Sequence, residues 1–212
     1  MDYKKAFIKL CIEKEALKFG KFELKSGRTS PFFFNSGVFT DGQSINLISE
    51  LFLQIIKEKK INFTNIFGPA YKGIPLATGL AQIMFKNNMG VVNFVFDRKD
   101  EKKHGEGGEL IGTFLPGDTI IVDDVITAGT AIKKSLENVN KYEIQINDLI
   151  VLLDRKEKGE SSKAASEEIK MQFNIDVHSI ITIHDILKFI GNDVNYRHFK
   201  ANVEEYIEKF GV

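Results

Sequence analysis

The sequence predicts an α/β fold with a central parallel sheet flanked by helices. Short runs of β-branched and aromatic residues, which favour strands, recur at 65–67, 91–96, 119–122, 149–153 and 177–183. Helical patterns separate most of these runs, at about 72–87, 128–142 and 161–174. Strands that are apolar on both faces and alternate with helices are typical of a parallel sheet that is covered on both sides.

The remaining segments complete the predicted domain, and the N-terminal helix and hairpin among them form a smaller cap beside the sheet. In chain order they are a helix at 2–19, a hairpin at 21–39, a helix at 43–60, a polar connection at 97–118 and two short helices within 184–210. A polar connection of this length within a compact domain is usually functional or mobile. Because no internal repeat or linker interrupts the chain, we expect one domain over 1–212, with a small N-terminal hood from about 1–40 and a core from about 41–212.

Composition narrows the class of protein. Of the 212 residues, 43% are hydrophobic, which is enough for a substantial core without disulfides or a structural metal. The 29 basic and 29 acidic residues cancel, which argues against a nucleic-acid-binding surface. The single cysteine, Cys11, lies in an amphipathic stretch, so we expect a buried thiol. No apolar stretch is long enough for a signal peptide or a membrane span, so we expect a cytoplasmic protein without a membrane partner.

The segment from Thr119 to Ala131 carries the strongest chemical signal. A buried strand runs into two carboxylates, Asp123 and Asp124, and a turn of small and hydroxyl residues then opens a helix. Ligands of open α/β sheets bind at the carboxyl ends of strands, and the free N–H groups of a helix N-terminus suit a phosphate. The acids would suit sugar hydroxyls or a divalent cation. Neither a Walker P-loop nor a dinucleotide fingerprint is present.

This segment resembles the phosphoribosyl-pyrophosphate (PRPP) motif of the type I phosphoribosyltransferases. The resemblance implies the fold of that family, with Asp123 and Asp124 on the ribose hydroxyls and the following loop around the 5′-phosphate. The PRPP-binding residues that it implies here are Asp123, Asp124, Val125, Ile126, Thr127, Ala128, Gly129, Thr130 and Ala131.

The polar stretch from Phe96 to Gly108 packs four cations and a histidine beside three glycines. It could be a solvated run of charges, or a loop that closes over a polyphosphate and excludes water. It resembles the mobile loop of the orotate-specific branch of the family. That resemblance implies a homodimer in which the loop 98–108 completes the neighbouring subunit's site, and it assigns contacts with PRPP to Arg98, Lys99, Lys102 and His104. We expect Lys102, with Asp124, to be catalytic.

The predicted hairpin, from Phe22 to Asn35, contains three consecutive phenylalanines, so rings project from both faces of the strand. It could be a hairpin buried on both sides, a dimer contact, or a platform on which a flat heterocycle stacks. Its sequence resembles a segment that marks the same orotate-specific branch. The resemblance implies that Phe33 and Phe34 contact orotate and that Lys25 contacts PRPP.

Two further strand ends fit this interpretation. Residues 68–76 form a turn between a strand and a helix, and the resemblance assigns Tyr71 and Lys72 to the pyrophosphate of PRPP. Arg155 follows the strand 149–153; it could form a surface ion pair, or grip a planar carboxylate such as that of orotate. The family places a substrate arginine here, and we expect Thr127 to contact orotate as well.

The resemblance therefore implies transfer of the phosphoribosyl group from PRPP to orotate, giving orotidine 5′-monophosphate and pyrophosphate, a step of pyrimidine synthesis. The expected cofactor is Mg²⁺, held mainly by PRPP and water rather than by a cage of protein carboxylates. Two alternatives remain: a purine or uracil phosphoribosyltransferase, which should lack the hairpin motif, and a regulatory PRPP-binding module without catalysis, which could lose the cationic loop.

Overall fold

The computed structural model describes residues 3–24, 27–102, 108–142 and 144–212. Its helices and strands follow one another as α1 (Tyr3–Glu13), β1 (Leu17–Glu23), β2 (Thr29–Phe34), α2 (Gly42–Lys59), β3 (Asn65–Phe67), α3 (Gly73–Lys86), β4 (Asn93–Lys102), β5 (Gly108–Ile111), β6 (Thr119–Ile126), α4 (Thr130–Asn140), β7 (Ile146–Asp154), α5 (Ala165–Phe173), β8 (Asp176–Thr182), α6 (Ile183–Asn192) and α7 (Lys200–Phe210). Single 3₁₀ turns lie at Ser36–Val38 and Arg197–Phe199.

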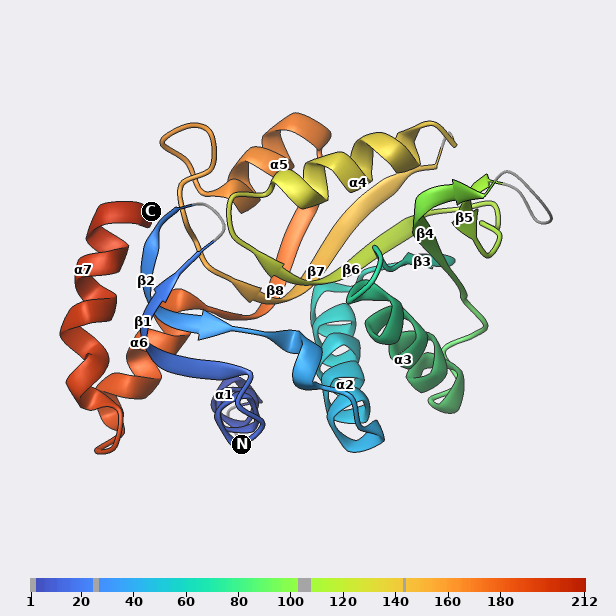
Figure 1. Ribbon diagram of the computed structural model, residues 1–212. Helices are drawn as coiled ribbons and strands as arrows, with labels where there is room; N and C mark the ends of the chain where they lie inside the picture. Colours follow the sequence, from blue (N-terminus) through green and yellow to red (C-terminus); the bar gives the residue numbers. More distant parts are fainter. Residues whose placement is uncertain (1–2, 25–26, 103–107, 143) are drawn as a thin grey trace.

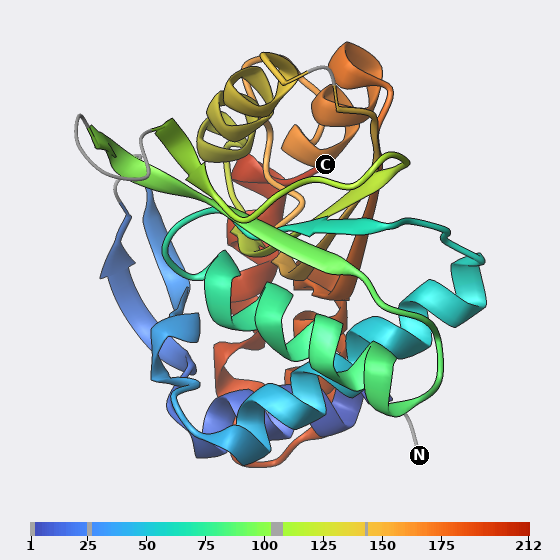
Figure 2. The ribbon, with the colours of Figure 1, turned by 90° about the vertical axis from the view of Figure 1, so that its right-hand side faces the viewer.

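A six-stranded sheet with the order β5-β4-β3-β6-β7-β8 forms the centre of the molecule (Figure 1). The neighbouring strands from β4 to β8 are parallel, and only β5 at the edge runs antiparallel. Figures 1 and 2 both show α4 and α5 on one face and α2 and α3 on the other. This confirms the predicted α/β class, and the apolar strands are explained by burial on both faces.

The hydrophobic core divides into two clusters, one on each face of the sheet. The larger cluster joins side chains of the sheet, such as Ile66 and Val122, to Phe7 of α1 and to Phe32 and Phe34 of β2. The smaller cluster lies under α4 and α5. Cys11 is buried in the larger cluster, as expected for a core thiol. The N-terminal helix and hairpin therefore share a core with the sheet.

The antiparallel pair β1–β2 forms a separate small sheet, as the hairpin pattern predicts. Figure 1 shows it beside α7, and contacts join α7 to β2 and α1 to β1. The C-terminal helices thus support the hairpin, a role that the sequence did not indicate. None of the helices in the described ranges is long and apolar enough to cross a membrane.

Two predicted boundaries were wrong. The helix expected over 2–19 ends at Glu13, because Glu15 adopts a positive φ of 58° that stops the helix, and Leu17 already begins β1. The polar stretch expected as a connection over 97–118 is partly strand, because β4 continues to Lys102 and pairs with β5, with Phe96 opposite Ile111. Polar residues tolerate an extended backbone here because the pair lies at the sheet edge and projects beyond the rest of the sheet (Figure 2).

Candidate active site

The candidate site lies where the strand order reverses. β3 leads through α3 to β4 on one side, whereas β6 lies on its other side and leads to β7. Such a switch point, at the carboxyl ends of the strands, is where open α/β sheets bind ligands. Lys72 follows β3, and Asp123 and Asp124 lie near the end of β6. The topology therefore brings together residues that the sequence placed on separate segments.

Asp124 is the centre of a buried polar contact. Its side chain is nearly inaccessible, with the residue 6% exposed, and its Oδ2 accepts hydrogen bonds from Oγ of Ser36 at 2.6 Å and from Nζ of Lys72 at 2.9 Å. The ammonium thus offsets the cost of burying the carboxylate. Ser36 is a contact that the sequence analysis missed, although it directly follows the hairpin motif.

Asp123 has a different environment from its neighbour. Its Oδ1 accepts the backbone N–H of Asp124 at 2.8 Å. Burial, and secondly the adjacent Asp124 carboxylate, raise the pKa of Asp123 to about 7, while the Lys72 ammonium opposes this shift. The raised pKa of Asp123, together with its burial at a strand end, is typical of a carboxylate in a functional site.

The turn between β6 and α4 has the geometry of an anion site. Gly129 adopts φ 78° at the N-cap of α4 and has no side chain to cap the first turn. A Cβ there would lie 3.3 Å from Cβ of Ala165, so the backbone also needs a small residue. Thr130 and Ala131 are exposed, whereas the side chain of Ile126 is in the core, so only its backbone can meet a ligand.

The two ends of the turn between β3 and α3 lie very close together. A Cβ on Gly68 would lie 2.4 Å from the carbonyl oxygen of Gly73, so the strand end and the helix start can approach only without a side chain. The Ala70–Tyr71 peptide is cis, and the N–H of Ala70 donates to Oδ1 of Asp97 at 2.6 Å. This bond ties the Lys72 turn to the base of the β4–β5 pair.

The cationic stretch 96–108 lies only partly within the described residues. Its base includes Arg98, whose Nε is one of two buried side-chain polar atoms without a hydrogen-bond partner in the described ranges; the other is Oγ1 of Thr119. The backbones of Lys99 and Lys102 belong to β4, but their side chains lie outside the described residues. His104 and Lys25 lie outside the described residues altogether.

The hairpin separates its three phenylalanines as the alternation of a strand predicts. Phe32 is fully buried and Phe34 is 7% exposed, whereas Phe33 points to the other face and is 39% exposed. The Phe33 ring packs against Phe22, with centroids 5.5 Å apart. Phe33 is thus the ring with an open face, and Phe34 belongs to the core cluster.

Arg155 lies deeper than the sequence suggested. It is 3% exposed, and its guanidinium stacks 4.1 Å from the centroid of Phe32. Its backbone N–H donates to the carbonyl of Ile126 at 3.1 Å, which fixes it beside the Asp123–Thr130 loop. Glu157 forms an ion pair with it at 2.5 Å, and both side chains are buried. The alternative of an ion pair on the protein surface is therefore wrong. Glu157 and Tyr206 around this arginine were not singled out from the sequence, because nothing in their local pattern marks them.

No cluster of three or more His, Cys, Asp or Glu side chains that could hold a metal occurs within the described ranges. One oxygen of each acid is already engaged, Oδ2 of Asp124 by Lys72 and Ser36, and Oδ1 of Asp123 by the backbone. This donor set suits a cation that brings most of its own oxygen ligands.

Known proteins of similar sequence and fold define the class of protein to which this chain belongs. The sequence model of the phosphoribosyl transferase domain matches residues 38–185, so the chain is a phosphoribosyltransferase. Orotate phosphoribosyltransferases of Actinobacillus pleuropneumoniae serotype 5b and Proteus mirabilis are 43% and 40% identical, over 100% and 99% of this chain and 99% and 98% of their own lengths. The crystal structure of the Francisella tularensis orotate phosphoribosyltransferase has a TM-score of 0.84 and 30% identity, covering 98% of this chain and all of that one. The chain belongs to the orotate phosphoribosyltransferase family.

Proposed function

We propose that the site at the ends of β3, β6 and β7 transfers the phosphoribosyl group of PRPP to orotate, with the two substrates recognised mainly by different elements and Thr127 shared between them. The observation that carries this proposal is made at the point where the strand order reverses. There Nζ of Lys72 donates to Oδ2 of Asp124, and the N-terminus of α4, which follows β6, has no side-chain cap. The product would be orotidine 5′-monophosphate, with pyrophosphate released, which is the activity named for the relatives.

The PRPP end uses the acid pair and the turn after it. Asp123 and Asp124 accept hydrogen bonds from the ribose hydroxyls, and the N–H groups of 127–131 hold the 5′-phosphate. Lys72, with the backbone at Tyr71, binds the pyrophosphate. The Lys72–Asp124 ion pair of the free protein, at 2.9 Å, supports this assignment, because PRPP offers partners to both groups when it enters.

The orotate end uses the hairpin and Arg155. The heterocycle contacts β2 at Phe33 and Phe34, Thr127 contacts its ring, and Arg155 binds its carboxylate. The position of Arg155 beside Ile126 and its packing against Phe32 of β2 support this arrangement. An arginine held in one orientation can form the parallel hydrogen bonds that a planar carboxylate prefers.

The reaction joins a ring nitrogen of orotate to the anomeric carbon as the bond from that carbon to pyrophosphate breaks, through an oxocarbenium-like state. Positive charge from Lys102, Arg98, Lys99 and His104 would stabilise the departing pyrophosphate. Closure of the loop 98–108 would exclude water from the reactive carbon. The bond between Ala70 and Asp97 supports this proposal, because it couples the base of that segment to the pyrophosphate turn.

Mg²⁺, bound mainly through PRPP oxygens and water, would supply additional charge for the leaving group. The engagement of one oxygen of each acid by protein groups favours this mode over a protein cage. We further propose a homodimer in which the loop 98–108 completes the partner's site. Mixing a Lys102→Ala protein with an Asp124→Asn protein, each of strongly reduced activity, should then restore part of the activity, and no recovery would contradict shared sites.

The direct test is to supply the protein with PRPP, Mg²⁺ and one base at a time. Formation of orotidine 5′-monophosphate from orotate, with little product from uracil or hypoxanthine, is the expected result. Product from uracil or hypoxanthine but not from orotate would refute the proposal. Replacing Lys102 with Ala should reduce kcat far more than it weakens orotate binding, and an unchanged kcat would remove its assigned role.

A further inference from the structure

Arg155 is held by the nearby Glu157 and by two side chains from distant parts of the chain, Ser30 and Tyr206. Its Nε donates to Oε1 of Glu157 at 2.5 Å, and its Nη2 donates to Oγ of Ser30 at 2.9 Å and to the hydroxyl of Tyr206 at 3.2 Å. The Tyr206 hydroxyl donates in turn to Oε1 of Glu157 at 2.7 Å. We call Arg155, Glu157, Ser30 and Tyr206, together with Arg28, the Arg155 network. Every distance in it is that of a hydrogen bond.

The charges of the network do not cancel. Oε2 of the fully buried Glu157 side chain also accepts from Nη1 of Arg28 at 2.7 Å, so two guanidinium groups share one carboxylate. The Arg28 side chain is 21% exposed, whereas that of Arg155 is 3% exposed, so the buried group that shares its carboxylate is Arg155. A buried guanidinium whose charge is only partly offset is stabilised by a further anion. The network therefore suits the carboxylate of a bound ligand.

The bonds of Arg155 leave one end of its guanidinium available. They engage Nε and Nη2, and within the described ranges Nη1 donates no hydrogen bond. The backbone bond to Ile126 keeps the residue next to Thr127 of the PRPP loop. Since Nε and Nη2 are fixed on one side and the ring of Phe32 covers one face, Nη1 is the donor left for a ligand.

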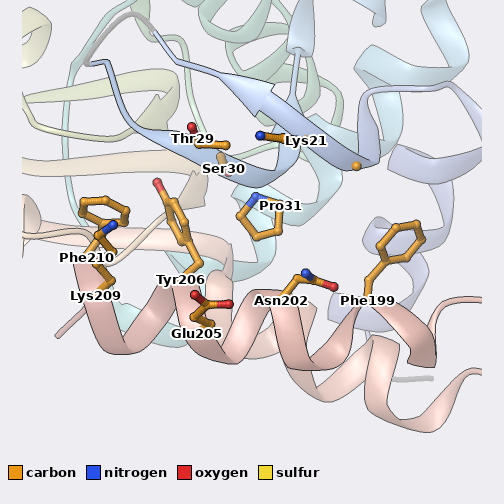
Figure 3. A pocket seen from close by; sticks show the side chains of 11 residues that line it. Lys21, Thr29, Ser30, Pro31, Phe199, Asn202, Glu205, Tyr206, Lys209 and Phe210 are labelled. Carbon is orange, nitrogen blue, oxygen red and sulfur yellow. The ribbon is translucent and has the colours of Figure 1, made fainter.

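Tyr206 connects this network to the C-terminal helix. Figure 3 shows its ring rising from α7 with the hydroxyl end toward the hairpin, where Ser30 and Pro31 lie. Tyr206 and Ser30 both line a pocket of about 550 Å³ between the hairpin and α7, and both bond to Arg155, so they separate this pocket from the guanidinium. Burial raises the pKa of Tyr206 above its usual value, so its hydroxyl keeps the proton that it donates to Glu157.

We propose that Tyr206 is a positioning residue for orotate: by bridging Glu157 and Arg155, its hydroxyl orients the guanidinium so that Nη1 meets the orotate carboxylate. This inference rests on the proposed role of Arg155 in binding orotate. The proposed role of Tyr206 means that α7, which is far in sequence from the turn 127–131, contributes to the selection of orotate over other bases. It also explains a tyrosine here, because phenylalanine would pack alike but could not join the two charged groups.

Tyr206→Phe removes only this hydroxyl and is therefore the variant to measure. The KM for orotate should rise roughly three- to tenfold, the range expected for one hydrogen bond in a charged network, while the KM for PRPP stays within about twofold of the wild type. The inhibition constant of uracil, which lacks the carboxylate, should not change. Tyr196→Phe is the matched control, because Tyr196 also packs an aromatic ring on the hairpin, against Phe19 at 5.4 Å, without a hydroxyl bond among the described residues.

A double-mutant cycle with Arg155→Lys separates this inference from the assignment on which it rests. Tyr206→Phe should add little to the orotate KM of the Arg155→Lys protein, because the group that it orients is gone. An unchanged orotate KM in Arg155→Lys would overturn the assignment of Arg155 itself. A raised KM in Arg155→Lys, combined with an unchanged one in Tyr206→Phe, would overturn only the positioning role. Equal losses for orotate, uracil and PRPP in Tyr206→Phe would show a merely structural effect and also overturn it.

Discussion

The two ends of the site are built in opposite ways. At the proposed PRPP end, the acid pair and the turn after it are consecutive residues of one strand–turn–helix unit, to which Lys72, Ser36 and the cations of 98–104 are added from elsewhere. At the orotate end, Ser30, Arg155 and Tyr206 meet from β2, the end of β7 and α7. A phosphate and a ribose can thus be held by local backbone geometry, whereas a carboxylate on a flat ring needs charges brought together by the whole fold.

The largest difference between the PRPP end and the orotate end of the site should be seen when Asp124 is replaced. Asp124→Asn keeps the shape but removes the charge that Lys72 and Ser36 contact and that the ribose hydroxyls would use. We expect kcat/KM for PRPP to fall about a hundredfold or more, with a much smaller change in the KM for orotate. Initial rates with each substrate varied in turn provide the measurement. Asp176→Asn, an exposed acid at the start of β8, is the control and should behave as the wild type.

Lys72 should give the next largest effect. Lys72→Ala removes a cation proposed to bind pyrophosphate and leaves the buried Asp124 carboxylate without its ammonium partner. We expect the KM for PRPP to rise by about tenfold or more, and the orotate KM to stay nearly constant. Lys86→Ala, at the other end of α3, is a suitable control. Equal increases in both KM values would mean that Lys72 does not belong to the PRPP end alone.

The two ends should also differ in their response to pH. Because the pKa of Asp123 is raised to about 7, this acid takes up a proton as the pH falls through neutrality, and its ability to accept hydrogen bonds from ribose weakens. The KM for PRPP should therefore rise below about pH 7, while the KM for orotate stays level. In Lys72→Ala the rise should begin at higher pH, since the lysine lowers this pKa. A flat PRPP profile from about pH 6 to 8 would contradict this account of Asp123.

Ser36 should give the smallest effect. Ser36→Ala removes one hydrogen bond of 2.6 Å to a carboxylate that keeps its lysine. We expect the KM for PRPP to rise only about two- to fivefold, without loss of kcat. Ser161→Ala, in an exposed loop, serves as the control for a lost hydroxyl. A change as large as that of Asp124→Asn would show that Ser36 does more than orient the acid.

The same contrast explains what the sequence could predict. The strand–acid–turn–helix order from Thr119 to Ala131 is local, so its pattern predicts both the elements and their ligand chemistry. Two partners of Arg155, Ser30 and Tyr206, are 125 and 51 residues away along the chain, and no local pattern links them to it. The predicted length of the first helix was wrong because a single positive φ, at Glu15, decides where α1 ends. The strand character of 97–102 was missed because pairing with β5, not apolar alternation, holds it extended.

The central claim, that separate elements recognise PRPP and orotate, is tested most directly by one set of measurements. KM values for both substrates are determined in the wild type, in Asp124→Asn and in Arg155→Lys, from formation of orotidine 5′-monophosphate. The account predicts a crossed pattern, in which Asp124→Asn chiefly impairs PRPP and Arg155→Lys chiefly impairs orotate. Parallel losses for both substrates in both variants would contradict it.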